Sequence, residues 1–407
     1  NKTLVSSAML AVLGTTVAAG GIERTQQSAL ILYKDGNYAE FSLGQVRPEV
    51  TGKDNSEFGG SDIDNVADQY NLPSFGAKFR LNDQVSIALI TDRPFGANTS
   101  YGGGATTTAF GTTTAEASTE ALTLLGKYQF NENFSAFGGI RRQTAEGAIS
   151  LGGLAYTSTT VNGLPASAVV NALTGGLIPN ATRAGFTYDV DLESGAANGF
   201  VLGAAYEIPD VALRVALTYN SEITHKLSTS ETYNQIALIG TNSVTLNTLT
   251  EDSTTEVKTP KSWNLEFQSG VAKDTLLFGS IRWVEHSVFR LDPKLFVDQR
   301  DTGLIEFDDT FTYRIGVGRR FSENFAGQIS FAKETAADDM KSPLGPTAGF
   351  TSVAAGGAYT FDNGFELSGG INYTWLGDAR AQTGDVARAR FDDNTALAAG
   401  IKLSYTF

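Results

Sequence analysis

Apolar and polar residues alternate one by one along many segments of this chain, and this period of two limits its fold more than any other feature. From residue 211 to residue 220 the odd positions are apolar, and the even positions are small, polar or charged. The same alternation recurs at 277–283, 311–318 and 366–375. Because successive side chains of a β-strand point to opposite faces, the pattern predicts strands with one apolar, aromatic face and one small or polar face.

The connections between these segments alternate between short and long. Six short turns, rich in residues that tolerate turn dihedrals, lie at 81–84, 131–133, 208–210, 272–274, 322–324 and 362–364. Seven long segments separate them, at 51–70, 94–116, 151–183, 229–256, 291–308, 335–349 and 377–388. A soluble sandwich has no reason to keep this order, whereas an outer-membrane barrel has turns at its periplasmic end and loops at its extracellular end. The sequence therefore predicts an all-β fold, a transmembrane antiparallel β-barrel of about fourteen strands.

One segment decides whether the strand count is even. Residues 184–208 contain the run 194–199, Ser-Gly-Ala-Ala-Asn-Gly, which could form a turn. A turn there would give an odd number of strands, while bacterial barrels have an even number, with both chain ends on the periplasmic side. We therefore expect 184–208 to be one long strand with a glycine-marked bulge.

Composition agrees with a barrel and excludes several function classes. Charged residues make up 18% of the chain, below the roughly 25% of ordinary soluble domains. No apolar run reaches the length of about 20 residues that a membrane-spanning helix needs. The net charge of −14 argues against nucleic acid as a partner. The absence of cysteine excludes disulfides, thiol catalysis and cysteine-based metal sites.

The N-terminal residues have the order of a secretory signal. Lys2 precedes the apolar run 8–13, and the small residues at 17–19 suit a cleavage site. We expect residues 1–19 to be a signal peptide that directs the protein beyond the inner membrane, with a short buried helix as the alternative.

The last strand carries a second localisation signal. Ile401, Leu403, Tyr405 and Phe407 alternate with polar residues, and Phe407 stands last. Such a strand looks like the signal that the barrel assembly machinery of the outer membrane recognises, so this machinery is an expected partner.

Several blocks of the chain follow one another in a characteristic order. They are the opening strand 36–52, Arg93-Pro94-Phe95-Gly96, the hairpin 122–137, the run 192–222 with Leu192-Glu193-Ser194-Gly195 and Tyr206-Glu207, the stretch Tyr313-Arg314-Ile315-Gly316, and the tail 354–407. In these blocks the chain resembles the FadL/TodX family of outer-membrane transport proteins for fatty acids and hydrocarbons.

The resemblance implies a fourteen-stranded barrel with an N-terminal hatch inside it and a lateral opening at a kinked strand. The family's hatch usually carries an Asn-Pro-Ala motif after about forty mature residues; here the segment 25–30, Thr-Gln-Gln-Ser-Ala-Leu, stands in its place. We therefore expect a shortened hatch or plug at 20–36, followed by a transmembrane barrel with long extracellular loops at 37–407.

Two predicted loops are rich in apolar residues and low in charge, as the entry surface for an apolar solute should be. In the family, loops at these positions form a hydrophobic capture groove; alternatively, the loops pack on each other as a cap, and a cap can itself form the groove. The candidate ligand-binding residues are Leu151, Leu154, Leu164, Val169, Leu173, Leu177, Ile178, Ile236 and Leu238.

Charged residues also occur on the faces that should line the lumen, namely Arg141, Arg214, Glu266, Arg282 and Arg314. An arginine could bind a ligand carboxylate with two parallel hydrogen bonds. We favour the alternative, in which these charges pair with one another and are hydrated.

The sequence thus predicts a multi-pass protein of the outer membrane that takes up hydrophobic compounds such as long-chain fatty acids by diffusion. Extracellular loops would capture the compound and the barrel wall would release it, in contact with outer-membrane lipid. A general porin for small polar solutes is the alternative, and an adhesin or structural barrel is a third class.

An enzyme is not expected. The two histidines, His225 and His286, have no serine or carboxylate constellation in the sequence, and neither a G-x-S-x-G motif nor metal-ligand spacing is present. A barrel-embedded lipid hydrolase is the enzymatic alternative, and we expect no cofactor and no metal.

Overall fold

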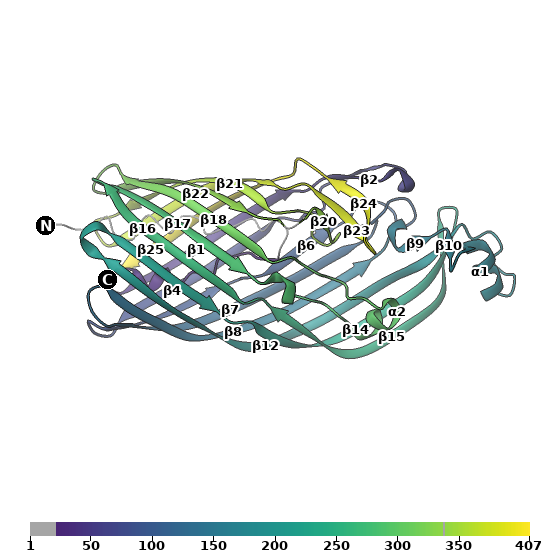
Figure 1. Ribbon diagram of the computed structural model, residues 1–407, viewed down its shortest axis with the longest axis horizontal. Coiled ribbons are helices and arrows are strands. Elements are labelled where there is room, and N and C mark those ends of the chain that lie inside the picture. Colours follow the sequence, from purple (N-terminus) through teal and green to yellow (C-terminus); the bar gives the residue numbers. More distant parts are fainter. Residues whose placement is uncertain (1–21, 337) are drawn as a thin grey trace.

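A computed structural model describes residues 22–336 and 338–407, which form one closed antiparallel barrel of fourteen strands (Figure 1). Both the all-β class and the strand count predicted from the sequence are confirmed. β1 pairs with β25 on one side and with β4 on the other, and these pairings close the sheet. Among the described residues, no helix combines the length and the apolar character needed to cross a membrane.

Three of the fourteen barrel strands are each made of two consecutive segments. The wall consists of β1 (Tyr38–Glu49), β4 (Tyr70–Arg80), β5 (Val85–Asp92) with β6 (Gly96–Ser100), β7 (Thr114–Gln129), β8 (Phe134–Leu151), β12 (Arg183–Ile208), β13 (Leu213–Asn220) with β14 (Ile223–Ile239), β15 (Asn242–Thr259) with β16 (Ser262–Ala272), β17 (Thr275–Val284), β18 (Thr310–Arg320), β19 (Phe325–Glu334), β21 (Phe350–Thr360), β22 (Phe365–Leu376) and β25 (Thr395–Thr406). The short β9 (Thr157–Ser158) adds to the edge of β12.

The period of two gives each strand a lipid-facing side and a lumen-facing side. In β25, Ile401 and Leu403 are exposed at 63% and 48%, whereas Lys402 and Ser404 between them are buried. An apolar residue can be this exposed on a barrel because the surface it faces is lipid rather than water. Trp263 and Trp375 are also exposed on the outside, as expected for residues at a membrane interface.

The six short turns lie at one end of the barrel, which we call the turn end. Asn37 and Phe407 lie there as well, and they exchange two backbone hydrogen bonds of 3.1 and 3.0 Å. At the opposite loop end, β20 (Met340–Lys341), β23 (Ala379–Thr383), β24 (Val386–Phe391), β2 (Gly52–Asp54) and β3 (Asp62–Ile63) form a separate five-stranded sheet.

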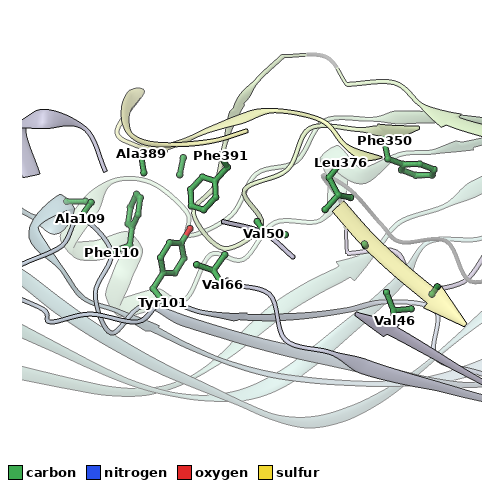
Figure 2. Packing of buried hydrophobic residues seen from close by; sticks show 14 of the residues in the cluster. Val46, Val50, Val66, Tyr101, Ala109, Phe110, Phe350, Leu376, Ala389 and Phe391 are labelled. Atoms are coloured by element: carbon green, nitrogen blue, oxygen red, sulfur yellow. The ribbon is translucent and has the colours of Figure 1, made fainter. Parts of the chain in front are cut away.

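This sheet covers an apolar core at the loop end. Tyr101, Phe110 and Phe391 pack together beneath it (Figure 2). Asp54 ties the loop after β6 to the sheet, since its Oδ2 accepts the Ala109 N–H at 3.0 Å, and burial raises the pKa of this carboxyl. The loops therefore pack into a cap.

Residues 184–208 form the expected long strand. β12 runs without interruption from Arg183 to Ile208, and its pairing with β8 shifts register between Leu192 and Gly195. The glycine-marked bulge is therefore confirmed, and the potential turn at 194–199 does not form.

The prediction of a long loop at 229–256 was wrong. β14 and β15 pair continuously from Ile223↔Thr259 to Ile239↔Asn242, with one register shift between Gln235 and Ile236, and residues 240–241 form a tight turn. Many residues here are threonine, which is β-branched and favours strands even where water replaces lipid. The hairpin, with β12 beside it, therefore extends the wall at the loop end (Figure 1).

The remaining elements are short. They are η2 (Leu30–Tyr33), η3 (Ser56–Phe58), η4 (Leu154–Tyr156), β10 (Thr160–Val161), β11 (Leu164–Pro165), α1 (Ala166–Leu173), η5 (Pro209–Val211), η6 (His286–Val288) and α2 (Lys294–Arg300). The expected signal peptide at 1–19 lies outside the described residues.

Candidate transport site in the lumen and the barrel wall

The segment 22–33 lies inside the barrel and contacts opposite sides of the wall. Thr25 Oγ1 donates to Asp92 Oδ2 on β5 at 2.8 Å, and Ser28 Oγ donates to Glu266 Oε1 on β16 at 2.8 Å. Glu23 forms an ion pair with Arg282 on β17, and both side chains are almost fully buried. Because β5 and β16–β17 lie across the lumen from each other, these contacts hold the segment in place from two sides.

Below these contacts, η2 fills the lumen with apolar residues. Ile31, Leu32 and Tyr33 are buried and pack against Leu125 and Phe137 of the wall. A cavity of about 270 Å³ remains beside η2, with polar and charged side chains in its lining that include Arg314, Glu266 and Lys402. The turn-end half of the lumen is thus occupied partly by the N-terminal segment and partly by a polar space.

Above the N-terminal segment lies a smaller and more apolar cavity of about 70 Å³. Its lining includes Phe95 beside β6, Leu192 on β12 and Phe289 in the loop after β17. α2 belongs to the same buried apolar cluster through Leu295 and Phe296, whose N–H groups donate to the Glu231 carboxylate at 3.0 and 2.9 Å. We call this space the apolar cavity.

The wall is interrupted between β4 and β5–β6. Towards the turn end, pairing begins at Phe75↔Thr91, and towards the loop end it resumes with the bridge Ala67↔Thr99. Between these points, no backbone hydrogen bond joins residues 69–74 to residues 92–97 in the part of the chain that the structure describes. We call this interruption the β4/β6 gap.

The N-terminal segment fills the β4/β6 gap from inside. The carbonyl oxygen of Pro94 accepts the N–H of Arg24 at 2.7 Å, and the N–H of Gly96 donates to Ile22 O at 2.7 Å. Proline lacks an N–H and is tolerated in strands mainly at edges and bulges. Pro94 thus marks the point where the neighbour of the wall strand changes from β4 to the N-terminal segment.

A second interruption lies between β12 and β14, at the bulge. Pairing stops at Leu192↔Thr229 and resumes at Val201↔Asn220, and within the described chain residues 193–199 have no backbone pairing with residues 222–228. Side chains of β14 cover this β12/β14 gap: the His225 ring lies 3.1 Å from the Gly195 carbonyl oxygen, measured from Nδ1, and is fully buried.

The candidate loop residues do not form one surface. Leu151, Ile236 and Leu238 are buried, Leu154, Val169 and Ile178 are half-buried, and Leu164, Leu173 and Leu177 are exposed at 58%, 74% and 84%. The three exposed leucines lie on or next to α1, at the tip of the loop end (Figure 1). Leu151 is the last residue of β8, and Ile236 and Leu238 belong to β14, so these three residues lie in wall strands rather than in loops, which corrects their placement.

The five candidate lumen charges all have polar neighbours inside the barrel. Arg141 Nε donates to Thr123 Oγ1 at 2.9 Å, and Arg214 donates to Gln268 Oε1 at 2.8 Å. Glu266 and Arg282 bind the N-terminal segment, while Arg314 lines the polar cavity. Glu266 and Arg282 thus contact the N-terminal segment, and no ion pair joins two of these five side chains in the described chain.

Sequence reasoning missed the residues that fill the β4/β6 gap, above all Arg24, Tyr70 and Asn98. A signal was available in Pro94, since a proline inside a strand marks an edge or a bulge. Arg24, which contacts this edge, is separated in sequence from Gly96 by 72 residues and from Asn98 by 74 residues. No local sequence pattern therefore identifies it.

The fold and the lumen define an outer-membrane barrel whose interior is partly occupied by its own N-terminal segment and contains an apolar cavity. A family model described as outer membrane protein transport protein (OMPP1/FadL/TodX) matches residues 10–407. The chain therefore belongs to the FadL/TodX family, whose members are outer-membrane transport proteins for hydrophobic compounds and not enzymes.

Solved structures of this family share the fold. A FadL homologue of Pseudomonas aeruginosa is 15% identical, with a TM-score of 0.70 and coverage of 97% of both chains. The toluene transporter TodX of P. putida is 16% identical, with a TM-score of 0.64 and coverage of 93% of this chain and 92% of that chain. The toluene transporter TbuX of Ralstonia pickettii is 12% identical, with a TM-score of 0.58 and coverage of 92% and 90%. No curated protein matches the sequence significantly.

Proposed function

We propose that this protein takes up hydrophobic compounds such as long-chain fatty acids by diffusion, through the apolar cavity and out of the barrel wall at the β4/β6 gap. The observation that carries the proposal is the position of the apolar cavity, whose lining includes Phe95, Gly96 and Ala97 at the gap itself. Burying apolar surface stabilises a ligand by about 25 cal/mol per Å². A hydrophobic solute would therefore leave water for the cavity and then leave the cavity for lipid.

We also propose roles for three other parts of the molecule. The exposed leucines 164, 173 and 177 would capture ligand at the loop end, residues 20–36 would act as the plug, and the last strand with Phe407 would guide barrel assembly. The capture role is supported by the position of these three exposed leucines on or next to α1, since exposed apolar side chains that lie together often mark binding surfaces.

A porin for small polar solutes is the competing function, and the polar cavity of about 270 Å³ beside η2 favours it. The two functions differ in ion flow. Large and steady single-channel currents in planar bilayers would support the porin and contradict the proposal, because a plugged lumen should conduct few ions.

Uptake by proteoliposomes tests the proposal directly. Wild type should accelerate uptake of a radiolabelled long-chain fatty acid, with toluene as a second probe that separates aliphatic from aromatic substrates. Phe289→Asp places a charge in the apolar cavity and should reduce uptake about tenfold. Val386→Asp adds the same charge on an exposed part of β24 and should leave uptake unchanged. Equal uptake by wild type and Phe289→Asp would contradict a route through the cavity.

A further inference from the structure

The N-terminal segment pairs by its backbone with residues 94–96 on one side of the β4/β6 gap, and on the other side the Arg24 side chain reaches β4. Its guanidinium carbon lies 3.3 Å from the centre of the Tyr70 ring on β4. On the other side, its Nε donates to Gly96 O at 3.0 Å and its terminal nitrogen donates to Asn98 Oδ1 at 3.1 Å. Arg24 thus joins β4 to β6 across the stretch where the two strands do not pair.

Within the described residues, the positive charge of Arg24 is not paired with a carboxylate. Among residues 22–336 and 338–407, no carboxylate lies within ion-pair distance of its guanidinium. Its contacts are a ring face, a carbonyl oxygen and an amide oxygen. Each of these neutral partners holds a cation less tightly than a carboxylate does. In contrast, its neighbour Glu23 is fixed by the buried charge of Arg282.

Two cavities near the β4/β6 gap share part of their lining. A second cavity, of about 90 Å³, is lined by Arg24 and Tyr70 and lies at the gap. It shares Ile22, Gly96, Ala97, Phe307 and Leu344 with the apolar cavity. The route from the apolar cavity towards β4 therefore leads to the space that the Arg24 side chain occupies.

We propose that Arg24 is the latch of the wall opening, a positioning residue that closes the β4/β6 gap by bridging Tyr70 to Gly96 and Asn98. This inference rests on the proposed function for its purpose, but the latch can be tested without any transported substrate. Passage of a solute into lipid requires the guanidinium to leave the Tyr70 ring and the Asn98 amide. Its neutral partners allow this displacement, while Glu23 and Thr25 on either side stay anchored to the wall.

Two substitutions should change the rate at which the β4/β6 gap opens in opposite directions. Asn98→Asp keeps the shape of the side chain and turns its hydrogen bond with Arg24 into a charge-assisted one, which is roughly twice as strong. Arg24→Met keeps much of the side-chain volume but removes the hydrogen bonds and the cation. We expect Asn98→Asp to slow opening about tenfold and Arg24→Met to accelerate it by a similar factor.

Opening can be measured with a single reporter, because the chain has no native cysteine. Ala97 lines both cavities, so the rate at which a lipid-soluble maleimide modifies Ala97→Cys in proteoliposomes reports access through the wall. A water-soluble, membrane-impermeant maleimide on the same variant reports access through the lumen. Arg24→Met should raise only the first rate, and Asn98→Asp should lower only that rate. Asn234→Asp, which adds a charge on the extended part of β14, is the matched control.

The outcomes separate the latch from the transport proposal. Equal lipid-phase labelling in wild type, Arg24→Met and Asn98→Asp would overturn the latch, provided that each variant retains the circular dichroism of a folded barrel. If Asn98→Asp still slows labelling in an Arg24→Met background, the effect does not pass through Arg24, and the latch is again overturned. Labelling rates in the expected order would support the latch even if wild type transports no fatty acid or toluene, which would overturn the proposed function alone.

Discussion

The two gaps in the barrel wall face the same apolar cavity but are filled in different ways. The β12/β14 gap is covered by side chains of the wall itself, with Ile223 and Leu227 packed over glycines and His225 held at Gly195 O. The β4/β6 gap is filled by the N-terminal segment, which is not part of the wall. Both gaps contribute lining residues to the cavity, Leu192 and Leu227 from one and Phe95 and Gly96 from the other.

Because of this difference we propose the β4/β6 gap as the exit and interpret the β12/β14 gap as a structural seam. A gap filled by β14 can open only if the strand itself moves, and the pairing of β14 with β15 from Ile223 to Ile239 opposes that movement. At the β4/β6 gap the contact with β4 is made by the Arg24 side chain, so this gap can open while every strand stays paired. Loss of backbone pairing therefore does not by itself make an opening; the filling must also be displaceable.

The largest effect is expected when the ion pair that anchors the N-terminal segment is removed. Arg282→Met leaves the Glu23 carboxylate buried without a partner, and breaking a buried pair in this way costs about 3–5 kcal/mol. We expect the segment to leave its site, so that ion conductance in planar bilayers rises and labelling of Ala97→Cys increases. A second reporter, Ala197→Cys, lies at the β12/β14 gap. The rate at which the lipid-soluble maleimide modifies it should not change.

Two controls belong to this experiment. Arg290→Met removes an exposed arginine of the loop end and should leave conductance as in wild type. Adding Glu23→Gln to Arg282→Met removes the unpaired buried charge and should restore part of the closed state. If both reporters became equally reactive in Arg282→Met, the distinction between seam and exit would fail.

A smaller effect is expected at the seam. His225→Ala removes a buried ring and its contact with Gly195 O, which should lower the free energy of unfolding by about 2 kcal/mol. Because β14 stays paired with β15, uptake per folded barrel and labelling of Ala97→Cys should equal those of wild type. Thermal unfolding followed by circular dichroism, with uptake measured at a temperature where the variant is folded, checks both parts. Faster uptake by His225→Ala would identify the seam as a second exit.

The seam could be predicted from the sequence to a greater extent than the exit could. The run 194–199 lies in a strand whose alternation is visible, and requiring an even strand count turns that run into a bulge. The exit depends on Arg24, which belongs to a segment without periodicity, and on Tyr70 and Asn98, which are far from it in sequence. The hairpin 229–256 was missed although its threonine-rich alternation is a strand signal, because β14 and β15 are longer than a membrane-spanning strand needs to be.

The smallest expected effects come from one matched pair of substitutions, glycine to alanine at each gap. At Gly199, a Cβ atom would lie 2.6 Å from Ile223 Cγ1 and 2.7 Å from Ser221 Oγ. Ile223 is β-branched and packed in the wall, so Gly199→Ala should destabilise the barrel by about 1–2 kcal/mol without changing labelling of Ala97→Cys.

At Gly96, the added Cβ atom would lie 3.2 Å from Arg24 Nε and 3.0 Å from Ala117 O. The Arg24 side chain is long and can shift, so Gly96→Ala should change the free energy of unfolding by less than about 1 kcal/mol. The same shift weakens the hydrogen bond from Arg24 Nε to Gly96 O and should raise lipid-phase labelling of Ala97→Cys about twofold. Gly199→Ala would thus lower the stability measured by heat unfolding, whereas Gly96→Ala would raise the access measured by labelling. The opposite result would be a larger loss of stability in Gly96→Ala than in Gly199→Ala, with labelling unchanged. In that case the Arg24 side chain would be held as rigidly as Ile223, and neither gap would be an exit.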